Sequence, residues 1–325
     1  MIYEFAIEPD LVATWHDPRV AYPFVSQMGP GYPRVACAFP EAAWKNLVIG
    51  SLRELFPDGQ SPRWQTAKRN IEVLLRHLHE TGTTRTGKVR DGESWFVAVE
   101  REHAAYPFGG VLVKSSVARR PFLVVADQLG VEDFAAWTPA APSVLRQPRE
   151  LAEALAPLLR CATGLRFVDP YFDAADPTFR DPMREFLSAA QRRRDVNTLQ
   201  VEIHCGMAHH ELEQARRHAG RQLTELEFAE QKIQSCRTHL VPMLAAGVRL
   251  RTFVWASLVD RIHNRYILTK LGGVMLGTGL DRSPSGAGHT DDLTLLSKDQ
   301  HDKRWKQYVG NPSDLRLITQ SIISL

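Results

Sequence analysis

Short apolar segments alternate with helical ones along the second half of the sequence, and this alternation limits the folds open to the chain. The segments at 165–168, 199–204 and 248–255 have the length and the Leu, Val, Ile and Phe content of buried strands. Between them, residues 179–193 and 211–246 are predicted to be helices. Strands that alternate with helices favour an α/β sheet with helices on both faces.

The apolar segments that follow are too close together for helical crossovers. The segments at 261–268, 274–277 and 293–296 are separated by short turns, so we expect them to pair antiparallel. A last helix is predicted at 298–309. The second half of the chain is therefore predicted to form a mixed sheet flanked by helices.

The first part of the chain has a less regular pattern, which predicts a separate α+β domain. Its composition changes between Phe134 and Pro148, where proline and alanine interrupt regular structure. We therefore expect an N-terminal domain over residues 1–140, of unknown role, and a second domain over residues 148–325. The predicted strands of the first domain are 1–7, 94–100, 110–114 and 122–126, and its predicted helices are 41–55 and 64–79.

Composition argues against several classes of protein. The net charge is only +3, so an anion-binding surface would have to come from local clustering. The four cysteines are widely spaced without a C-x-x-C pair, which argues against a zinc site and favours free thiols in a reducing compartment. No signal-peptide pattern and no apolar run of membrane-spanning length is visible. We expect a cytoplasmic protein that does not contact a membrane.

Residues 262–297 carry the pattern with the most chemical content. His263 and Arg265 are two residues apart on a predicted strand, so their side chains point to the same face. Gly277 and Thr278 begin a glycine-rich turn in which backbone N–H groups can approach an anion closely. An imidazole, a guanidinium and a hydroxyl at one place are the groups needed to hold and attack a phosphodiester.

This segment resembles the H-x-K motif of the phospholipase D superfamily. His263 matches the family's nucleophilic histidine, and Arg265 stands at the position of its lysine. Gly277 and Thr278 stand where the family has Gly-Ser, and Asp291, before a strand, stands where it often has Glu. The order of strands and helices over residues 165–308 also resembles one repeat of the family's fold.

The motif departs from the family pattern at three positions. Arginine replaces lysine, which keeps the charge but changes the hydrogen-bond geometry. Lys270 stands at the position of the family's aspartate, and Leu280, with Asp281 beside it, stands at that of its asparagine. Two functions therefore stay open: a phosphodiesterase, or a module that binds nucleic acid or a protein without turnover.

The resemblance implies a phosphodiesterase that needs no metal and no other cofactor. Members with a single motif are often nucleases, so nucleic acid is the expected substrate, and a phospholipid or small phosphodiester is the less favoured alternative. A single motif also implies a homodimer in which both copies of His263 meet. A role in bacterial defence, with partner proteins bound by the N-terminal domain, is a further implication. The expected catalytic residues are His263, Arg265 and Asp291, and the expected phosphate ligands are Arg265, Gly277, Thr278 and Asp281.

Two further residues are expected at the rim of this site. Asp169 and Tyr171 follow the predicted strand at 165–168, and α/β sheets bind ligands at the carboxyl ends of their strands. The alternative is a simple turn, which Asp-Pro dipeptides often begin.

Two other patterns allow a functional and a structural interpretation. His204, His209 and His210 are close in sequence, but no further ligand stands at a spacing typical of a metal site. The predicted last helix interleaves basic residues with Trp305 and Tyr308, which suits nucleic acid but also an amphipathic helix with both rings buried.

Overall fold

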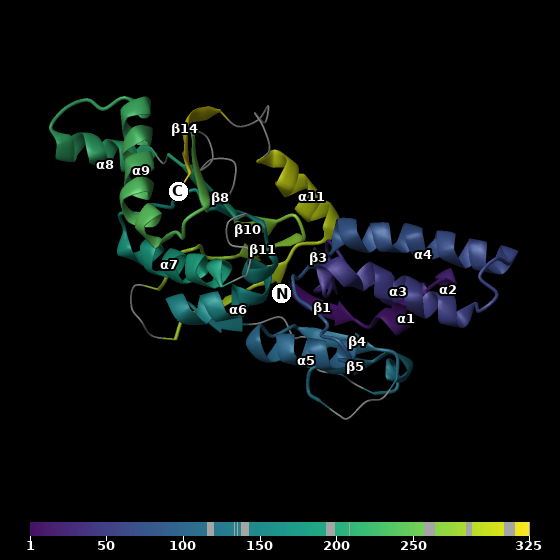
Figure 1. The fold of residues 1–325 in the computed structure, drawn as a ribbon. Coiled ribbons are helices and arrows are strands. Elements are labelled where there is room, and N and C mark those ends of the chain that lie inside the picture. The colour runs from purple at the N-terminus through teal and green to yellow at the C-terminus, as the bar shows by residue number, and fades with distance from the viewer. Residues whose placement is uncertain are drawn as a thin grey trace. The chain divides into compact units, whose positions relative to one another are not determined.

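The computed structural model of the protein describes residues 1–115, 120–132, 134, 136–137, 143–192, 199–207, 209–256, 264–283, 288–308 and 316–324. The chain divides into two compact units, residues 2–140 and residues 141–325 (Figure 1). Among the described residues, no helix has both the length and the apolar composition needed to span a membrane.

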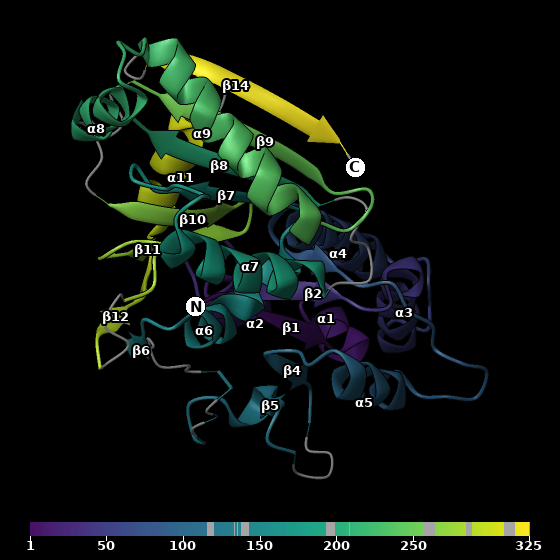
Figure 2. The ribbon, with the colours of Figure 1, turned by 90° about the vertical axis from the view of Figure 1, so that its left-hand side faces the viewer.

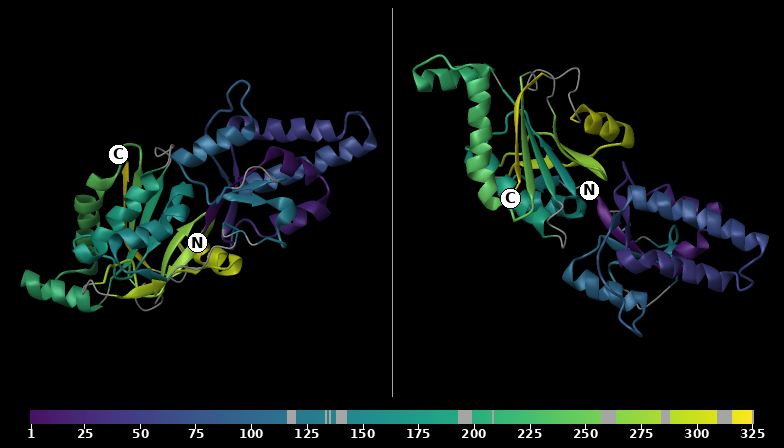
Figure 3. Two further views of the ribbon diagram at one scale, coloured as in Figure 1. Left: turned by 90° about the horizontal axis from the view of Figure 1, so that it is seen from below. Right: turned by 45° about the horizontal axis from the view of Figure 1, so that its top comes forward.

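The first unit is built on a parallel five-stranded sheet in the order β3-β2-β1-β4-β5. Two helices precede β2, two more precede β3 and one precedes β4, and the long helices α3 and α4 run side by side (Figures 1 and 3). The strands are β1 (Tyr3–Ile7), β2 (Arg34–Ala38), β3 (Thr83–Thr84), β4 (Gly110–Val113) and β5 (Leu123–Val125). The helices are α1 (Pro9–Thr14), α2 (Pro18–Val25), α3 (Glu41–Leu55), α4 (Pro62–Thr81) and α5 (Trp95–Ala105).

Each face of this sheet has its own apolar core. On one face Phe5 and Ile7 of β1 pack with side chains of α1 to α4, and on the other Ala6 packs with Ala98 and Val99 of α5. Alternate residues of one strand thus point to opposite faces, as the strand geometry requires. A parallel sheet covered on both faces is an α/β fold, so the expected α+β arrangement is wrong for this unit.

One segment of the first unit has a different secondary structure from the one predicted. Residues 94–100 contain an unbroken apolar run rich in valine and aromatic residues and were expected to form a strand, but Trp95–Ala105 is helix α5. The Ser94 hydroxyl accepts a hydrogen bond from the Val97 N–H and caps this helix. The cap, together with burial of Ala98 and Val99 against the sheet, outweighs the strand preference of the valines.

The second unit contains a mixed seven-stranded sheet in the order β13-β11-β10-β7-β8-β9-β14 (Figure 2). Strands β7, β8 and β9 are parallel and the remaining pairs are antiparallel. The short turns after residue 261 predicted the antiparallel pairing of β10, β11 and β13, whereas β14 was not predicted. The strands are β7 (Gly164–Val168), β8 (Gln200–Gly206), β9 (Arg249–Trp255), β10 (Arg265–Thr269), β11 (Gly272–Leu276), β13 (Thr294–Leu295) and β14 (Leu317–Ser324). A separate pair is formed by β6 (Ser143–Leu145) and β12 (Thr290–Asp292).

Helices cover both faces of the mixed sheet. α7 and α9 lie on one side and α11 lies on the other (Figures 1 and 2). The segment expected as one helix at 211–246 is broken at Gly220, which has a φ of +63°, and Thr224 starts the next helix with a capping box to Glu227. The helices are α6 (Pro148–Cys161), α7 (Pro177–Gln191), α8 (His209–Ala219), α9 (Glu225–Leu240) and α11 (Lys298–Gln307).

The aromatic residues of the last helix pack against the sheet. Tyr308 is buried, and Trp305 lies under Arg166, whose guanidinium carbon is 3.7 Å from the ring centroid. Arg166 also donates to Glu202, a buried carboxylate that Arg251 contacts from the next strand. The structure therefore agrees with the amphipathic interpretation of α11.

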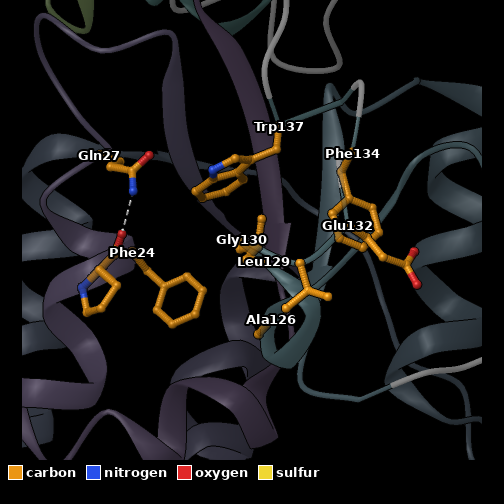
Figure 4. Close-up of a pocket in the computed structure, with 10 residues that line it drawn as sticks. Phe24, Gln27, Ala126, Leu129, Gly130, Glu132, Phe134 and Trp137 are labelled. Carbon is orange, nitrogen blue, oxygen red and sulfur yellow. Dashed lines mark hydrogen bonds between the residues drawn. The ribbon is translucent and has the colours of Figure 1, made fainter.

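The first unit also contains an open cavity of about 720 Å³ beside Trp137 (Figure 4). The Arg34 guanidinium carbon lies 4.3 Å from the centroid of the Trp137 ring, and Arg34 donates to the Trp137 carbonyl. Phe5 meets the same ring edge-on at 5.4 Å. Trp137 thereby closes the core over the β1 side of the sheet, and the Glu132 carboxylate points away from it.

We expect Trp137→Ala to lower the free energy of unfolding by about 3–5 kcal/mol, because it removes a buried ring and leaves a cavity. Tyr22→Ala, in a side chain that is 72% exposed, should change it by less than about 0.5 kcal/mol. Urea unfolding followed by circular dichroism measures both. Equal midpoints for the two variants would show that Trp137 does not hold this core.

Candidate functional site

Three segments of the second unit meet at one edge of the mixed sheet. β10 is antiparallel to β7 and pairs Tyr266 with Val168, so the start of β10 lies beside the end of β7. β10 is also antiparallel to β11 and pairs Arg265 with Leu276. The residues that follow β7, begin β10 and follow β11 therefore lie together, which brings Asp169 close to Arg265.

Asp169 is the buried centre of this edge. Its side chain is 1% exposed, and its two carboxylate oxygens accept hydrogen bonds of 2.9 Å from the Tyr171 and Leu280 N–H groups. Burial raises the pKa of this carboxyl, while the two N–H groups and the Arg265 charge act in the opposite direction. Asp169 thus ties the turn after β7 to the loop after β11.

Arg265 lies between Asp169 and an aromatic ring. Its Nε is 3.9 Å from Asp169 Oδ1, and its guanidinium carbon is 5.3 Å from the centroid of the Tyr171 ring. One fifth of the Arg265 side chain is exposed. The carboxylate and the ring fix the direction of the guanidinium, and solvent still reaches it.

The turn expected to cradle a phosphate already holds a carboxylate of the chain itself. Asp291 accepts hydrogen bonds from the Gly277 N–H at 3.2 Å, the Thr278 N–H at 3.4 Å and the Thr278 hydroxyl at 2.7 Å. Asp291 is buried, whereas Gly277 and Thr278 are exposed. The turn does bind an anion, and Asp291 fixes its shape.

The second half of the loop brings another carboxylate to the same place. Asp281 accepts from Arg146 Nη2 at 2.7 Å, and Arg146 also donates to the Asp281 carbonyl. A side chain at Gly279, where φ is +142°, would place its Cβ 2.3 Å from Asp281 Oδ1 and 3.4 Å from Asp169 Oδ2. The Asp169 and Asp281 carboxylates therefore approach each other across Gly279. Asp169 faces Arg265, and Asp281 is paired with Arg146.

Arg146 is the residue of this site that the sequence did not indicate. It follows β6. The Arg146 N–H donates a hydrogen bond to the His289 carbonyl, and the Arg146 carbonyl accepts one from the Ser283 N–H. β6 pairs with β12, the strand that carries Asp291. Arg146 and Asp281 are 135 positions apart in the sequence, so no local pattern predicts their contact.

The predicted site residues are thus placed in two linked groups. Asp169, Tyr171 and Arg265 contact one another, and Asp291 contacts Gly277 and Thr278. The Leu280 N–H joins the groups through Asp169. Asp281, which was expected to bind phosphate, is paired with Arg146, and like-charge repulsion makes a carboxylate an unsuitable phosphate ligand. His263 lies outside the described residues.

His204 lies within β8 and is packed among other side chains of the sheet. His204 is completely buried, stacks on Phe253 at 4.6 Å between ring centroids, and accepts from the Trp255 Nε1–H. Within the part of the chain that is described, no group of His, Cys, Asp and Glu side chains is arranged to hold a metal ion.

Comparison of the chain with protein-family models, with curated proteins and with solved structures gave no match. The site offers the partly exposed guanidinium of Arg265, an exposed glycine turn and a half-buried aromatic ring at a single sheet edge. These groups suit an anion that carries a planar or apolar substituent.

We expect Gly279→Ala to destabilise the second unit by about 1–3 kcal/mol, because alanine disfavours this φ and its Cβ would displace Asp281 from Arg146. Gly164→Ala is the matched control, since that glycine starts β7 and a Cβ there would meet nothing within 4 Å. Hydrogen exchange of residues 277–281 reports the loop directly. Equally slow exchange in the two variants would contradict the crowding at Gly279.

The raised pKa of Asp169 predicts a pH-dependent effect of Asp169→Asn. A carboxyl whose pKa is higher in the folded than in the unfolded protein binds protons more readily when folded, so it favours folding increasingly as the pH falls through the folded pKa. Wild type should therefore gain stability relative to Asp169→Asn between neutral pH and about pH 4. Urea unfolding at several pH values measures this difference. A relative loss over that range would show that Arg265 and the N–H groups outweigh burial.

Proposed function

We propose that the second unit is a metal-independent phosphodiesterase that acts on nucleic acid, with His263 as nucleophile and Arg265 as the residue that grips the phosphate. The observation that supports it most is the position of Arg265. Its guanidinium is held by Asp169 and Tyr171, stays partly exposed, and stands two residues after His263 beside the turn at Gly277. The H-x-R spacing and the turn together resemble the phospholipase D motif.

The proposed reaction has two steps, the formation of a phosphohistidine and its hydrolysis. An imidazole nitrogen of His263 attacks phosphorus, the bond to the leaving oxygen breaks, and a second histidine gives that oxygen a proton. Water then attacks the phosphohistidine, the P–N bond breaks, and the second histidine takes the proton of the water back. Arg265 would neutralise the charge that builds up on the phosphoryl oxygens.

The second histidine is proposed to come from another copy of the chain. The sequence offers one H-x-R motif followed by a glycine turn, and a twofold axis would bring two copies of His263 together. In mixtures of wild-type and His263→Ala subunits, activity should fall more steeply than the wild-type fraction. A monomer with full activity would contradict the shared site.

A binding function without turnover is the second candidate, and one contact favours it. Asp291 accepts hydrogen bonds from the Gly277 and Thr278 N–H groups and from the Thr278 hydroxyl, so fewer donors of the turn are left for a phosphate. Such a module would bind nucleic acid through Arg265 and leave it intact. Incubation of wild type and His263→Ala with DNA and RNA in the presence of a chelator separates the two candidates. Cleavage that is lost in His263→Ala supports the enzyme, and equal binding without cleavage supports the module.

Arg265→Ala should weaken phosphate binding much more than Arg265→Lys. Removal of the charge costs about 1.5–3 kcal/mol, or roughly ten- to 150-fold in affinity, whereas lysine keeps the charge and restores the residue usual in the resembling family. Arg149→Ala is the control, because that arginine is exposed on α6 and pairs only with Glu153 among the described residues. Calorimetric titration with a short oligonucleotide measures all three. Equal losses for Ala and Lys would show that guanidinium geometry, not charge, is required.

A further inference from the structure

Strand β14 lies at an edge of the mixed sheet, and its outer side has no partner strand among the described residues. It pairs with β9 on its inner side and is the last strand in the order of the sheet (Figure 2). β14 has eight residues, whereas β3, β5 and β13, the other edge strands of the two larger sheets, have two, three and two. The outward N–H and C=O groups of so long an edge form a row with which another strand can pair.

The sequence of β14 has few of the features that protect such an edge. Residues 317–324, LITQSIIS, contain no charged residue and no proline. The irregularity in its pairing with β9 lies between Leu317 and Thr319, at the beginning of the strand. The Ile322 side chain, near the other end, is 61% exposed. From Thr319 onward the strand is therefore regular, uncharged and open to a partner.

We infer that β14 pairs antiparallel with the β14 of a second copy of the chain, so that two mixed sheets become one continuous sheet. A twofold axis makes the two strands antiparallel, and each copy then covers the open edge of the other. Twofold pairing also brings residues near the axis close to their own copies, where like charges would repel each other. The uncharged sequence of β14 avoids this repulsion.

Helix α9 gives a second reason to expect another copy of this chain. It packs along β14 and β9, and the Ser235 hydroxyl on one of its flanks donates a hydrogen bond to Asp173, which follows β7 (Figure 2). With about 3.6 residues per turn, the opposite flank, on the side of the β14 edge, carries Leu226, Glu230 and Arg237. All three side chains are exposed, and neither charge has an ion pair within the described part of the chain.

The two charges on this flank complement each other across a twofold axis. Glu230 lies in the first half of α9, and Arg237 lies in its last turn. The twofold that makes the strands antiparallel also makes the two copies of α9 antiparallel. The Glu230 half of one helix then faces the Arg237 half of the other, in both directions. The surface beside β14 thus complements itself, which is why the partner is a second copy.

This interface is different from the one proposed for His263. β10 is four strands away from β14 in the sheet, and neighbouring strands are about 4.8 Å apart. Two copies joined through β14 therefore keep their β10 strands roughly 40 Å apart, too far for the two copies to share a catalytic site. The inference goes beyond the proposed function and does not depend on it.

Sedimentation velocity and hydrogen exchange of the full chain, at increasing protein concentration, test the pairing. We expect wild type to dimerise and the amides of residues 319–324 to exchange more slowly in the dimer. Ile322→Glu should raise the dimer dissociation constant by about tenfold or more, because it places two carboxylates near the twofold axis. The monomer should tolerate this change, since Ile322 is exposed and lies opposite Arg251 of β9. Val73→Glu is the matched control, in a side chain that is 59% exposed on α4, and should leave the dissociation constant within about twofold.

Charge reversal on α9 tests the twofold arrangement separately. Glu230→Arg and Arg237→Glu should each weaken the dimer by about three- to tenfold, because each places like charges together at two symmetric positions. The double variant should restore the wild-type dissociation constant, since opposite charges face each other again. A double variant that dimerises as weakly as the single ones would show that the helices do not meet in this way, and the inference would be wrong.

The exchange data separate this interface from any other. A wild-type chain that stays monomeric at every concentration would overturn the inference and leave the edge to a different partner. A dimer that Ile322→Glu does not weaken, with unchanged exchange at residues 319–324, uses another surface, such as the one proposed for His263. The inference is then wrong, and the proposed function is unaffected.

Discussion

A buried carboxylate at the end of the first long strand of the second unit holds the candidate site together. Asp169 accepts one hydrogen bond from its own turn and one from Leu280, 111 positions away in the sequence, and it faces Arg265. Removing one partner of such a buried pair leaves an uncompensated charge, at a cost of about 3–5 kcal/mol. The turn after β7, the start of β10 and the loop after β11 are therefore positioned by one another.

A second pair of aspartate and arginine lies at the same edge of the sheet. Asp281 faces Arg146, and Asp291 fills the turn at Gly277, so three aspartates hold a loop of only a few residues. Their charges are balanced by arginines and N–H groups, which leaves Arg265 as the partly exposed cation in direct contact with Asp169. A loop that is rigid before an anion arrives loses little entropy when the anion binds, which favours tight binding of a phosphate.

The order of strands and helices in the second unit could be predicted from local sequence patterns, whereas contacts between distant residues could not. The alternation of strands and helices over residues 165–255 predicted the α/β part of the mixed sheet, and the short turns over residues 261–296 predicted the antiparallel part. The strand end at residue 168 places Asp169 at the carboxyl edge of the sheet. The helix at Trp95 was missed because its cap at Ser94 and its burial outweigh the strand preference of its valine and aromatic residues. Arg146 was missed because its contact with Asp281 depends on the pairing of β6 with β12. The contacts of Thr278 with Asp291 likewise required side-chain geometry that spacing does not contain.

The central claim is that this edge of the sheet receives a phosphate between His263 and Arg265. A crystal structure of the full chain with orthovanadate, which imitates a phosphoryl group under attack, tests it most directly. We expect vanadium bonded to an imidazole nitrogen of His263 and a vanadate oxygen within hydrogen-bonding distance of the Arg265 guanidinium. Vanadate bound elsewhere, or an Arg265 that contacts only Asp169 and Tyr171 at saturating vanadate, would contradict it.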